Sequence, residues 1–202
     1  MEALRPSLIG LTGAIGSGKS EALKALARLG AATLSTDDAA HEALGDPDVV
    51  AKLVERWGPE VASGARIDRG RVGEIVFSDR DELRWLESIT HPRVAERVVE
   101  WQAGLGEDVK VGVVEVPLLF EANMQAFFDG VLVIVAGERR AEWLEARGDA
   151  GVEGRSGRQL TEAGKAERAT WVVSNDGTLE DLEANLSDLW PKLVAAKKDP
   201  VE

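Results

Sequence analysis

One eight-residue stretch near the start of the chain constrains its fold more than any other feature. Residues 13–20 read G-A-I-G-S-G-K-S, which matches the pattern G-x-x-x-x-G-K-S of a phosphate-binding P-loop. The glycines let successive backbone N–H groups curl around a phosphate, because no Cβ stands in the way. Lys19 can reach the β- and γ-phosphates of a nucleotide, and the Ser20 hydroxyl can bind Mg²⁺. The octet therefore predicts a site for nucleotide phosphates.

The segments on either side have the character that a P-loop requires. Residues 7–12, S-L-I-G-L-T, form a short apolar run typical of a buried parallel strand. Residues 21–30 are rich in helix formers, with Leu23 and Leu26 on one helical face and Gly30 as a suitable C-terminal stop. Lys-Ser directly after the last glycine argues against a ligand-free turn and against a G-x-G-x-x-G loop. We therefore predict strand, P-loop and helix in this order.

Apolar runs and helical patterns alternate along the rest of the chain. Further strands are predicted at 31–35, 109–116, 131–135 and 171–174. Thr178 is predicted to cap a final helix. The alternation predicts an α/β fold, a P-loop NTPase-type parallel sheet flanked by helices, within one domain over 1–202. A helical insertion at about 37–105 is expected to bind an acceptor, and a segment at about 137–168 is expected to form a lid.

The composition narrows the class of protein. The chain has 202 residues, no cysteine and two histidines, which excludes disulfides and a Cys/His zinc site. Any metal should be a hard cation bound by oxygen. No apolar run reaches the roughly 18 residues of a membrane span, and no secretory signal precedes the first strand, so a cytoplasmic protein without a membrane partner is expected. A net charge of −12 disfavours nucleic acid, and no protein partner is indicated.

A P-loop indicates phosphate binding, and other residues must indicate the reaction. The chain has no N-K-x-D guanine signature, and its size and helical insertion favour a small-molecule kinase, which must close over two substrates. Ligands of such sheets bind at the carboxyl ends of the strands. Asp37 follows the second strand and could accept the proton of an attacking hydroxyl. The alternative is that Asp37 or Asp38 only caps a helix over 39–44.

Several motifs together resemble those of the dephospho-CoA kinases, and the resemblance covers nearly the whole chain. Residues 9–20 are similar to the opening of that family, and 116–121, V-P-L-L-F-E, are similar to its most specific motif. Further similar motifs are 35–41, His91-Pro92 and 169–177. The resemblance implies an enzyme that uses ATP to phosphorylate the ribose 3′-hydroxyl of dephospho-CoA, the last step in the synthesis of coenzyme A.

The resemblance also implies roles for individual residues. The catalytic residues would be Asp37, Lys19 and Arg147, with Arg147 on the lid. The ATP-binding residues would be Gly13, Ala14, Ile15, Gly16, Ser17, Gly18, Lys19, Ser20, Glu21, Arg147 and Asn175. The acceptor-binding residues would be Asp37, His41, His91, Pro117, Leu118, Leu119 and Phe120, with His41 where the family usually has Arg. Mg²⁺ would be the cofactor, with Ser20 as its protein ligand and Glu115 as a further partner.

Other interpretations of these residues stay open. His91-Pro92 could simply start a helix, since Pro is preferred at the first helical position. Residues 117–120 could be a strand exit with core packing, and Arg147 could be a surface charge. For the whole chain, the rivals are another small-molecule or nucleotide kinase, whose acceptor would lack the pantetheine arm, and a non-catalytic ATP-binding sensor. The intact P-loop and Asp37 argue against the sensor.

Overall fold

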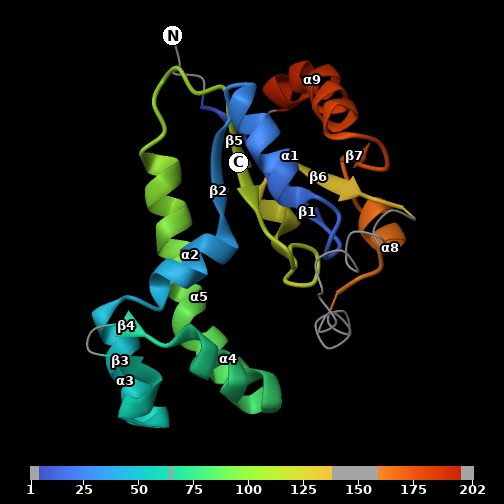
Figure 1. Cartoon of the computed structure of the whole chain (residues 1–202). Coiled ribbons are helices and arrows are strands. Elements are labelled where there is room, and N and C mark those ends of the chain that lie inside the picture. Colours follow the sequence, from blue (N-terminus) through green and yellow to red (C-terminus); the bar gives the residue numbers. More distant parts are fainter. Residues whose placement is uncertain (1–4, 64–65, 138–158, 197–202) are drawn as a thin grey trace. The chain divides into compact units, whose positions relative to one another are not determined.

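The computed structural model describes residues 5–63, 66–137 and 159–196, which form two compact units. Unit 1 combines Met1–Ser35 with Leu105–Glu202, and unit 2 is Thr36–Gly104. Figure 1 shows a sheet with helices in unit 1 and mainly helices in unit 2. Most of the predicted lid, including Arg147, lies outside the described residues.

Unit 1 is built on a five-stranded sheet in which every pairing is parallel. Its strands are β1 (Ser7–Gly13), β2 (Ala32–Ser35), β5 (Val111–Glu115), β6 (Gly130–Val135) and β7 (Trp171–Ser174), in the order β2-β5-β1-β6-β7. β1 lies in the centre and is buried along its whole length, as its apolar composition predicts. The strand order reverses at β1, and this is where open α/β sheets bind ligands. The predicted parallel sheet is therefore confirmed.

Two helices cover one face of this sheet. α1 (Lys19–Arg28) and α9 (Leu179–Ala195) contact each other and β1, and Figure 1 shows them on the same side. The core beneath them includes Ile9, Leu11, Leu26, Val111, Val113, Leu132, Ile134, Leu182, Leu186 and Leu193. α1 ends at Arg28, and the predicted stop, Gly30, follows two residues later with a φ of 101° that lets Ala31 N–H donate to Leu26 O at 3.0 Å. α9 begins at the predicted Thr178, which forms a capping box with Asp181.

The opposite face of the sheet carries the loop after β5, the 3-10 turn η2 (Met124–Phe127) and the short helix α8 (Glu162–Ala166). Gly10 of β1 lets this loop approach the sheet closely. A Cβ at Gly10 would lie 2.5 Å from Leu119 Cδ1 and 2.9 Å from Phe128 Cδ2. Both Leu119 and Phe128 are buried. Leu119 and Phe128 therefore anchor this loop in the core, whereas Phe127 is exposed.

Within the described residues, unit 2 is helical apart from a two-stranded hairpin that the sequence analysis did not predict. Its elements are α2 (Thr36–Ala43), α3 (Pro47–Trp57), η1 (Pro59–Val61), β3 (Ala62–Ser63), β4 (Arg66–Ile67), α4 (Arg69–Ser78) and α5 (Arg80–Ala103). Its buried core comprises Leu44, Val49, Leu53, Val61, Val72 and Val76. Asp46, Asp68 and Asp79 cap α3, α4 and α5 by accepting hydrogen bonds from first-turn N–H groups. Unit 2 thus has its own core and its own helix caps.

Two of the alternative interpretations are wrong. α2 begins at Thr36, directly after β2, so Asp37 and Asp38 lie in its first turn and neither caps a helix over 39–44. Acidic residues suit this turn, because the positive end of the helix dipole is there. Pro92 does not start a helix but lies in the interior of α5, where its missing N–H leaves the carbonyl of Ser88 without its helical donor.

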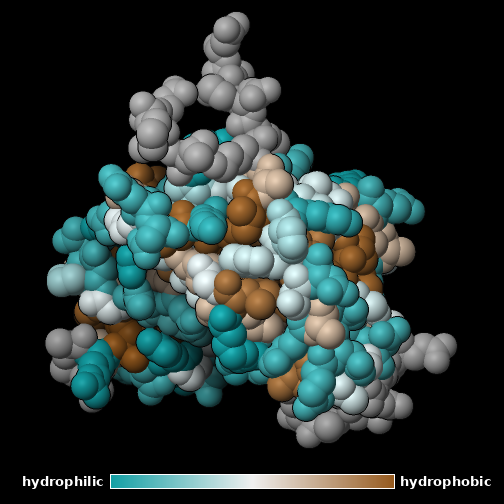
Figure 2. Space-filling view, turned by 90° about the horizontal axis from the view of Figure 1, so that it is seen from above, coloured by the Kyte–Doolittle hydropathy of each residue, from teal (hydrophilic) through white to brown (hydrophobic). Residues whose placement is uncertain are grey.

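Among residues 5–63, 66–137 and 159–196, no helix is long and apolar enough to cross a bilayer. Figure 2 shows hydrophobic patches separated by hydrophilic side chains on the face in view. The large apolar side chains with the most exposed surface are Phe77, Val99, Phe127, Val172 and Leu179. Single exposed apolar residues of this kind are ordinary in globular proteins.

Candidate active site

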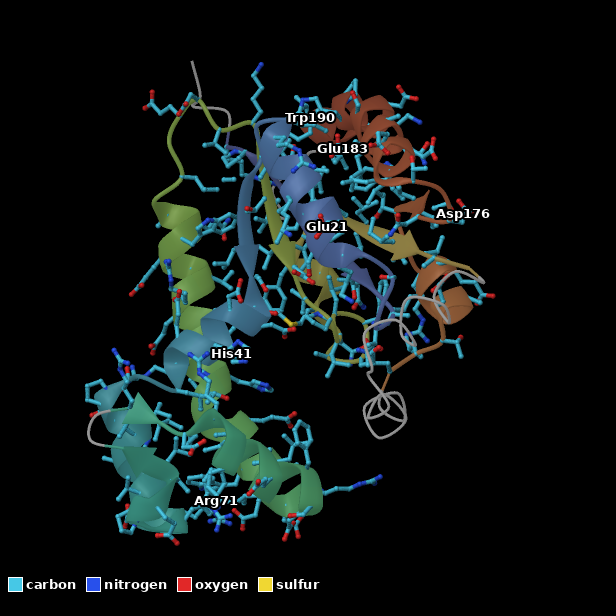
Figure 3. All side chains as sticks on the ribbon, viewed as in Figure 1. Glu21, His41, Arg71, Asp176, Glu183 and Trp190 are labelled. Atoms are coloured by element: carbon cyan, nitrogen blue, oxygen red, sulfur yellow. The ribbon has the colours of Figure 1, made fainter. Side chains whose placement is uncertain are left out.

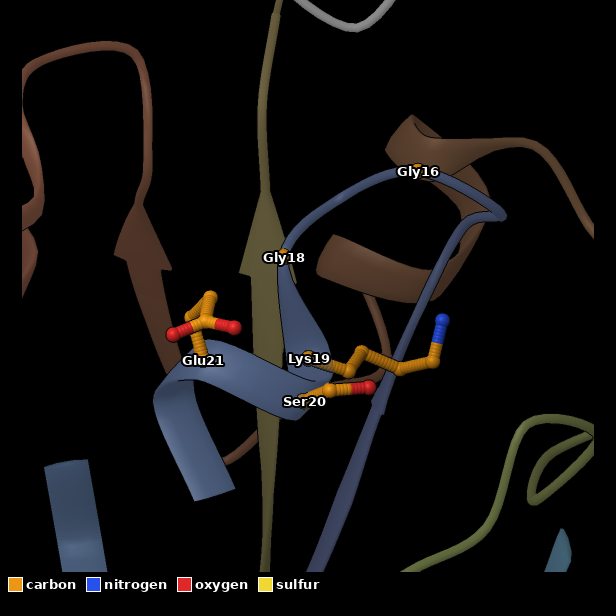
Figure 4. Close-up of a pocket in the computed structure, with 5 residues that line it drawn as sticks. All are labelled: Gly16, Gly18, Lys19, Ser20 and Glu21. Carbon is orange, nitrogen blue, oxygen red and sulfur yellow. The ribbon is translucent and has the colours of Figure 1, made fainter. Parts of the chain in front are cut away.

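The P-loop joins β1 to α1 and turns back through two glycines. Gly16 and Gly18 have φ values of 79° and 91°, a left-handed conformation that L side chains rarely adopt. Ser17 N–H donates to Ala14 O at 3.1 Å and closes the turn. Figure 4 shows the loop curving into the start of α1 at Lys19. The glycine spacing of the sequence therefore produces the curved backbone that a phosphate requires.

This loop forms a small pocket at the N-terminus of α1. The pocket has a volume of about 80 Å³ and is lined by Gly16, Gly18, Lys19, Ser20 and Glu21. It suits a phosphate group and not a whole nucleotide, since pockets that enclose whole ligands measure about 300–1,000 Å³. Gly18, the N-cap residue of α1, has no side chain that could cap the helix. Helix N-termini of this kind bind anions through their backbone N–H groups and the positive end of the dipole.

The side chains of the pocket point in two directions. Figure 4 shows Lys19 and Ser20 extending to one side of the helix start and Glu21 to the other. Lys19 Nζ donates to Ala14 O at 3.0 Å, so its ammonium lies back along the loop. Glu21 Oε1 accepts from Lys24 Nζ at 2.8 Å. Of the predicted ATP-binding residues, Glu21 can therefore serve through its backbone N–H and not through its carboxylate.

Asn175 directly follows β7, which lies two strands from β1 in the sheet, and its side chain holds the P-loop. It is 3% exposed, its Nδ2 donates to Ser17 O at 2.9 Å, and its N–H donates to Val135 O at 2.7 Å. Gly13 makes a second close contact, because a Cβ there would lie 2.5 Å from Ser17 Oγ and 2.6 Å from Ile134 O. Asn175 and Gly13 thus hold the loop backbone in place, and a direct contact between Asn175 and ATP stays a prediction.

The predicted acceptor residues after β5 differ in exposure. Pro117 and Leu118 are partly exposed, whereas Leu119 and Phe120 are 0% and 3% exposed. Core packing therefore accounts for the side chains of Leu119 and Phe120. Pro117 and Leu118 are the residues of this group that can meet a ligand directly, and their contact with an acceptor stays a prediction.

Three further predicted residues lie in unit 2. Asp37 is exposed in the first turn of α2, two residues after β2 ends at Ser35. His41 is exposed one turn later, and Figure 3 shows it on α2. The spacing of four places Asp37 and His41 on one face of this helix. His91 is exposed on a different helix, α5.

The donor chemistry of the pocket fits Mg²⁺ bound together with a nucleotide. The Ser20 hydroxyl supplies one oxygen ligand, and Mg²⁺ commonly takes its other ligands from substrate phosphates and water. Glu115, the last residue of β5, is 6% exposed and pairs with Leu11 of β1 in the sheet register. In the part of the chain that the structure describes, no three His, Cys, Asp or Glu side chains gather into a metal site. A magnesium ion here would therefore depend on the nucleotide for much of its coordination.

The sequence analysis missed Lys165 of α8. This side chain is 0% exposed, and its Nζ donates to Pro117 O at 2.6 Å and to Thr12 Oγ1 at 3.4 Å. It also pairs with Glu121 Oε1 at 3.2 Å. Burial lowers the pKa of Lys165, and the Glu121 carboxylate opposes this effect. No local pattern could have indicated this site, because a lysine in a short polar helix is ordinarily exposed.

A parallel sheet whose central strand runs into a P-loop, followed by a helix with glycine as its N-cap, defines a P-loop nucleotide-binding protein. The family model of the dephospho-CoA kinases matches residues 7–181. The chain therefore belongs to the dephospho-CoA kinase family, as the sequence motifs predicted.

Individual relatives support this membership over nearly the full length. The chain is 36% identical over 201 residues to a dephospho-CoA kinase of Thermus thermophilus, covering 98% of this chain and 97% of that protein. It is 39% identical over 186 residues to that of Deinococcus radiodurans, covering 90% and 89%. The crystal structure of TT1252 from Thermus thermophilus is similar with a TM-score of 0.78 and 35% identity, covering 94% and 99%. A dephospho-CoA kinase from Campylobacter jejuni shares the fold, with a TM-score of 0.66, 23% identity and coverage of 94% and 98%.

Proposed function

We propose that this chain transfers the γ-phosphate of ATP to the ribose 3′-hydroxyl of dephospho-CoA, which yields ADP and coenzyme A. The chain belongs to the dephospho-CoA kinase family. The observation that carries the proposal is the phosphate pocket. Gly16 and Gly18 turn the backbone there, so that the N-terminus of α1 and Lys19 line the same pocket. A cradle of this kind stabilises the charge on phosphates through backbone N–H groups.

On the nucleotide side, the backbone N–H groups of residues 13–20 and the side chain of Lys19 would hold the β- and γ-phosphates. Sheet pairing and Asn175 fix this loop in advance, so little reorganisation is needed as charge develops in the transition state. Mg²⁺, when bound with ATP, would neutralise charge on the β- and γ-phosphate oxygens, with Ser20 as its protein ligand and Glu115 as a further partner. Arg147, by resemblance to the family, would place a positive charge against the transferred phosphoryl group.

On the acceptor side, Asp37 would act as the general base. Its carboxylate would take the proton of the 3′-hydroxyl while that oxygen bonds to the γ-phosphorus and the bond to the β–γ bridging oxygen breaks, which releases ADP. The exposure of Asp37 two residues after the carboxyl end of β2 supports this role. His41, His91, Pro117 and Leu118 would contact dephospho-CoA, and the buried Leu119 and Phe120 would support the loop.

A single assay tests the reaction. The wild-type protein is incubated with ATP, Mg²⁺ and dephospho-CoA, and ADP and coenzyme A are measured in the same reaction. We expect equal amounts of both products, and no ADP with a panel of nucleosides and nucleotides in place of dephospho-CoA. ADP formed only with another acceptor would identify a different small-molecule kinase. ATP binding without any phosphorylated product would identify a sensor.

Replacement of the proposed base tests the mechanism. We expect Asp37→Asn to lower kcat by about 10²- to 10⁴-fold, the usual contribution of a general base, with the KM for ATP unchanged. Asp38→Asn is the matched control, because Asp38 is the adjacent exposed carboxylate on the same helix turn. It should keep most of the wild-type kcat. A near-normal kcat for Asp37→Asn would show that another group accepts the proton.

A further inference from the structure

Among the described residues, Lys165 is the one charged residue with no exposed surface, and the chemistry above does not use it. A buried charge is tolerated when it is paired and fully hydrogen-bonded. The three N–H donors of the ammonium match three acceptors: Pro117 O at 2.6 Å, Glu121 Oε1 at 3.2 Å and Thr12 Oγ1 at 3.4 Å. These acceptors lie at the end of β1 and at both ends of the loop 117–121. One side chain therefore joins the loop to the strand that carries the P-loop.

The sheet fixes the position of this lysine through its helix. Glu162 of α8 accepts hydrogen bonds from Ala136 N–H at 3.0 Å and Gly137 N–H at 3.1 Å, directly after β6. Lys165 lies one turn later on the same side, and its N–H donates to Thr161 O at 3.0 Å. α8 is thus attached to β6 before its lysine reaches the loop. Lys165 is therefore anchored to the sheet through its helix, while its ammonium contacts the loop.

The neighbours of Lys165 depend on it. Pro117 O accepts from Lys165 and also from Thr12 Oγ1 at 3.2 Å. Glu121 Oε1 accepts from Leu160 N–H at 2.7 Å. Glu121 Oε2 is buried and has no hydrogen-bond partner within the described residues. Without Lys165, this carboxylate would be left buried without a cation, and Pro117 O would lose its shorter hydrogen bond.

We propose that Lys165 is a positioning residue, which fixes the loop 117–121 in the conformation that binds dephospho-CoA. The inference rests on the proposed function, because it takes dephospho-CoA as the ligand of this loop. Pro117 and Leu118 form the exposed part of the loop, and Lys165 holds the carbonyl of Pro117 itself. A shift of this carbonyl moves the surface that the acceptor meets.

Lys165 also reaches Thr12, the residue before Gly13, but the P-loop itself is held by further contacts. Gly13 is placed by its register with Ile134 of β6, and Ser17 O is held by Asn175. Neither contact involves α8 or the loop 117–121. Loss of Lys165 should therefore weaken binding of the acceptor and leave binding of ATP almost unchanged.

Two variants with opposite expected effects test whether binding of the acceptor and binding of ATP depend on separate contacts. We expect Lys165→Met to raise the KM for dephospho-CoA on the order of tenfold, the effect of one lost charged hydrogen bond, with a change in the KM for ATP of about twofold or less. Asn175→Ala should show the reverse pattern, because it releases Ser17 O. Equal rises of both KM values in Lys165→Met would overturn the inference.

A double variant separates positioning from simple stability. Lys165→Met alone leaves Glu121 uncompensated and can lower the melting temperature. Lys165→Met/Glu121→Gln removes both charges and keeps an acceptor for Leu160 N–H, so the melting temperature should recover. We expect the KM for dephospho-CoA to stay raised, because Pro117 O still lacks its ammonium donor. Recovery of the wild-type KM in this double variant would reduce Lys165 to a counterion and overturn the proposal.

Amide hydrogen exchange supplies a readout that needs no substrate. The amides of Ala122, Asn123 and Met124 donate to the carbonyls of Leu118, Phe120 and Leu119 at 2.9, 3.1 and 2.9 Å. In the double variant these amides should exchange faster than in the wild type, while those of α1 should not change. Unchanged exchange would overturn the inference and leave the proposed function intact. Faster exchange with an unchanged KM for dephospho-CoA would refute the link to the acceptor, and a wild type that makes no coenzyme A would refute the proposed function itself.

Discussion

At the scale of single residues, the phosphate site is made mainly by backbone conformation. Gly16 and Gly18 supply the two left-handed turns, and Gly13 leaves room for the Ser17 hydroxyl. Lys19 adds a positive side chain to the pocket, whose other lining residues in the described part of the chain are glycine, serine and glutamate. A chain with a net charge of −12 thus presents a locally positive site to an anionic substrate.

Lys19 should be needed for nucleotide affinity as well as for rate. Lys19→Ala removes one charged hydrogen bond to the phosphates, so we expect ATP to bind about 10- to 100-fold more weakly by isothermal titration calorimetry. Lys192→Ala is the matched control, because Lys192 is an exposed lysine of α9 that does not line the pocket. It should bind ATP with the wild-type affinity. Unaltered ATP binding in Lys19→Ala would contradict the assigned role.

At the scale of secondary-structure elements, one carboxylate organises the contact between α3 and α5. Glu82 of α5 accepts from Arg56 Nε at 2.6 Å, from Arg56 Nη2 at 2.9 Å and from Trp57 Nε1 at 2.7 Å. The Arg56 guanidinium lies 4.5 Å from the ring centroid of Trp85, and Trp57 meets Trp85 edge to face at 5.1 Å. Two helices of unit 2 are therefore held by a bidentate ion pair and an aromatic contact.

The contact between α3 and α5 should weaken in acid. Hydrogen bonds from Arg56 and Trp57 lower the pKa of Glu82 in the folded protein. A lowered folded-state pKa stabilises the fold above the unfolded pKa of about 4.3, and this stabilisation is lost as the pH falls through the lower folded value. Urea unfolding should thus show Glu82→Gln less stable than wild type at pH 7, with a smaller difference below about pH 4.

Glu100→Gln makes the same change of charge at an exposed position of α5 and serves as the control for Glu82→Gln. It should unfold like the wild type at both pH values. A stability difference between Glu82→Gln and wild type that is as large in acid as at pH 7 would rule out titration of Glu82 as its source.

At the scale of the whole molecule, each of the two units has a hydrophobic core among the residues that the structure describes. Unit 2 is inserted after Ser35, and the chain returns to unit 1 at Leu105. Leu53 is 0% exposed in the core of unit 2, and Leu186 is 0% exposed in the core of unit 1. Because each core is built from its own residues, local stability can differ between the units.

Cavities in the two cores should therefore have separate effects. Leu53→Ala removes buried side-chain volume at a cost of about 2–5 kcal/mol. We expect faster amide hydrogen exchange throughout Thr36–Gly104 and little change in β1 and α1. Leu186→Ala is the reciprocal variant and should accelerate exchange in β1 and α1. Equal acceleration of both units by Leu53→Ala would show that they unfold as one cooperative body.

Features encoded over a few neighbouring residues were predictable from the sequence. The P-loop, the stop of α1 at Gly30 and the cap of α9 at Thr178 depend on glycine placement and on residues three or four positions apart. The parallel sheet follows from apolar runs that alternate with helical periodicity. The start of α2 and the interior position of Pro92 were not predictable, because competing local signals favoured other boundaries.

Contacts between distant parts of the chain emerged only on folding. Thr12 and Lys165 are 153 positions apart, and Ser17 and Asn175 are 158 apart, yet each pair forms a hydrogen bond beside the P-loop. Packing likewise placed Leu119 and Phe120 in the core, with Leu119 beside Gly10, although both belong to the family motif V-P-L-L-F-E. Short-range spacing sets backbone conformation. Tertiary contacts with the completed sheet decide which polar side chain becomes buried. The residues next to a lysine in the sequence do not indicate whether it will be buried.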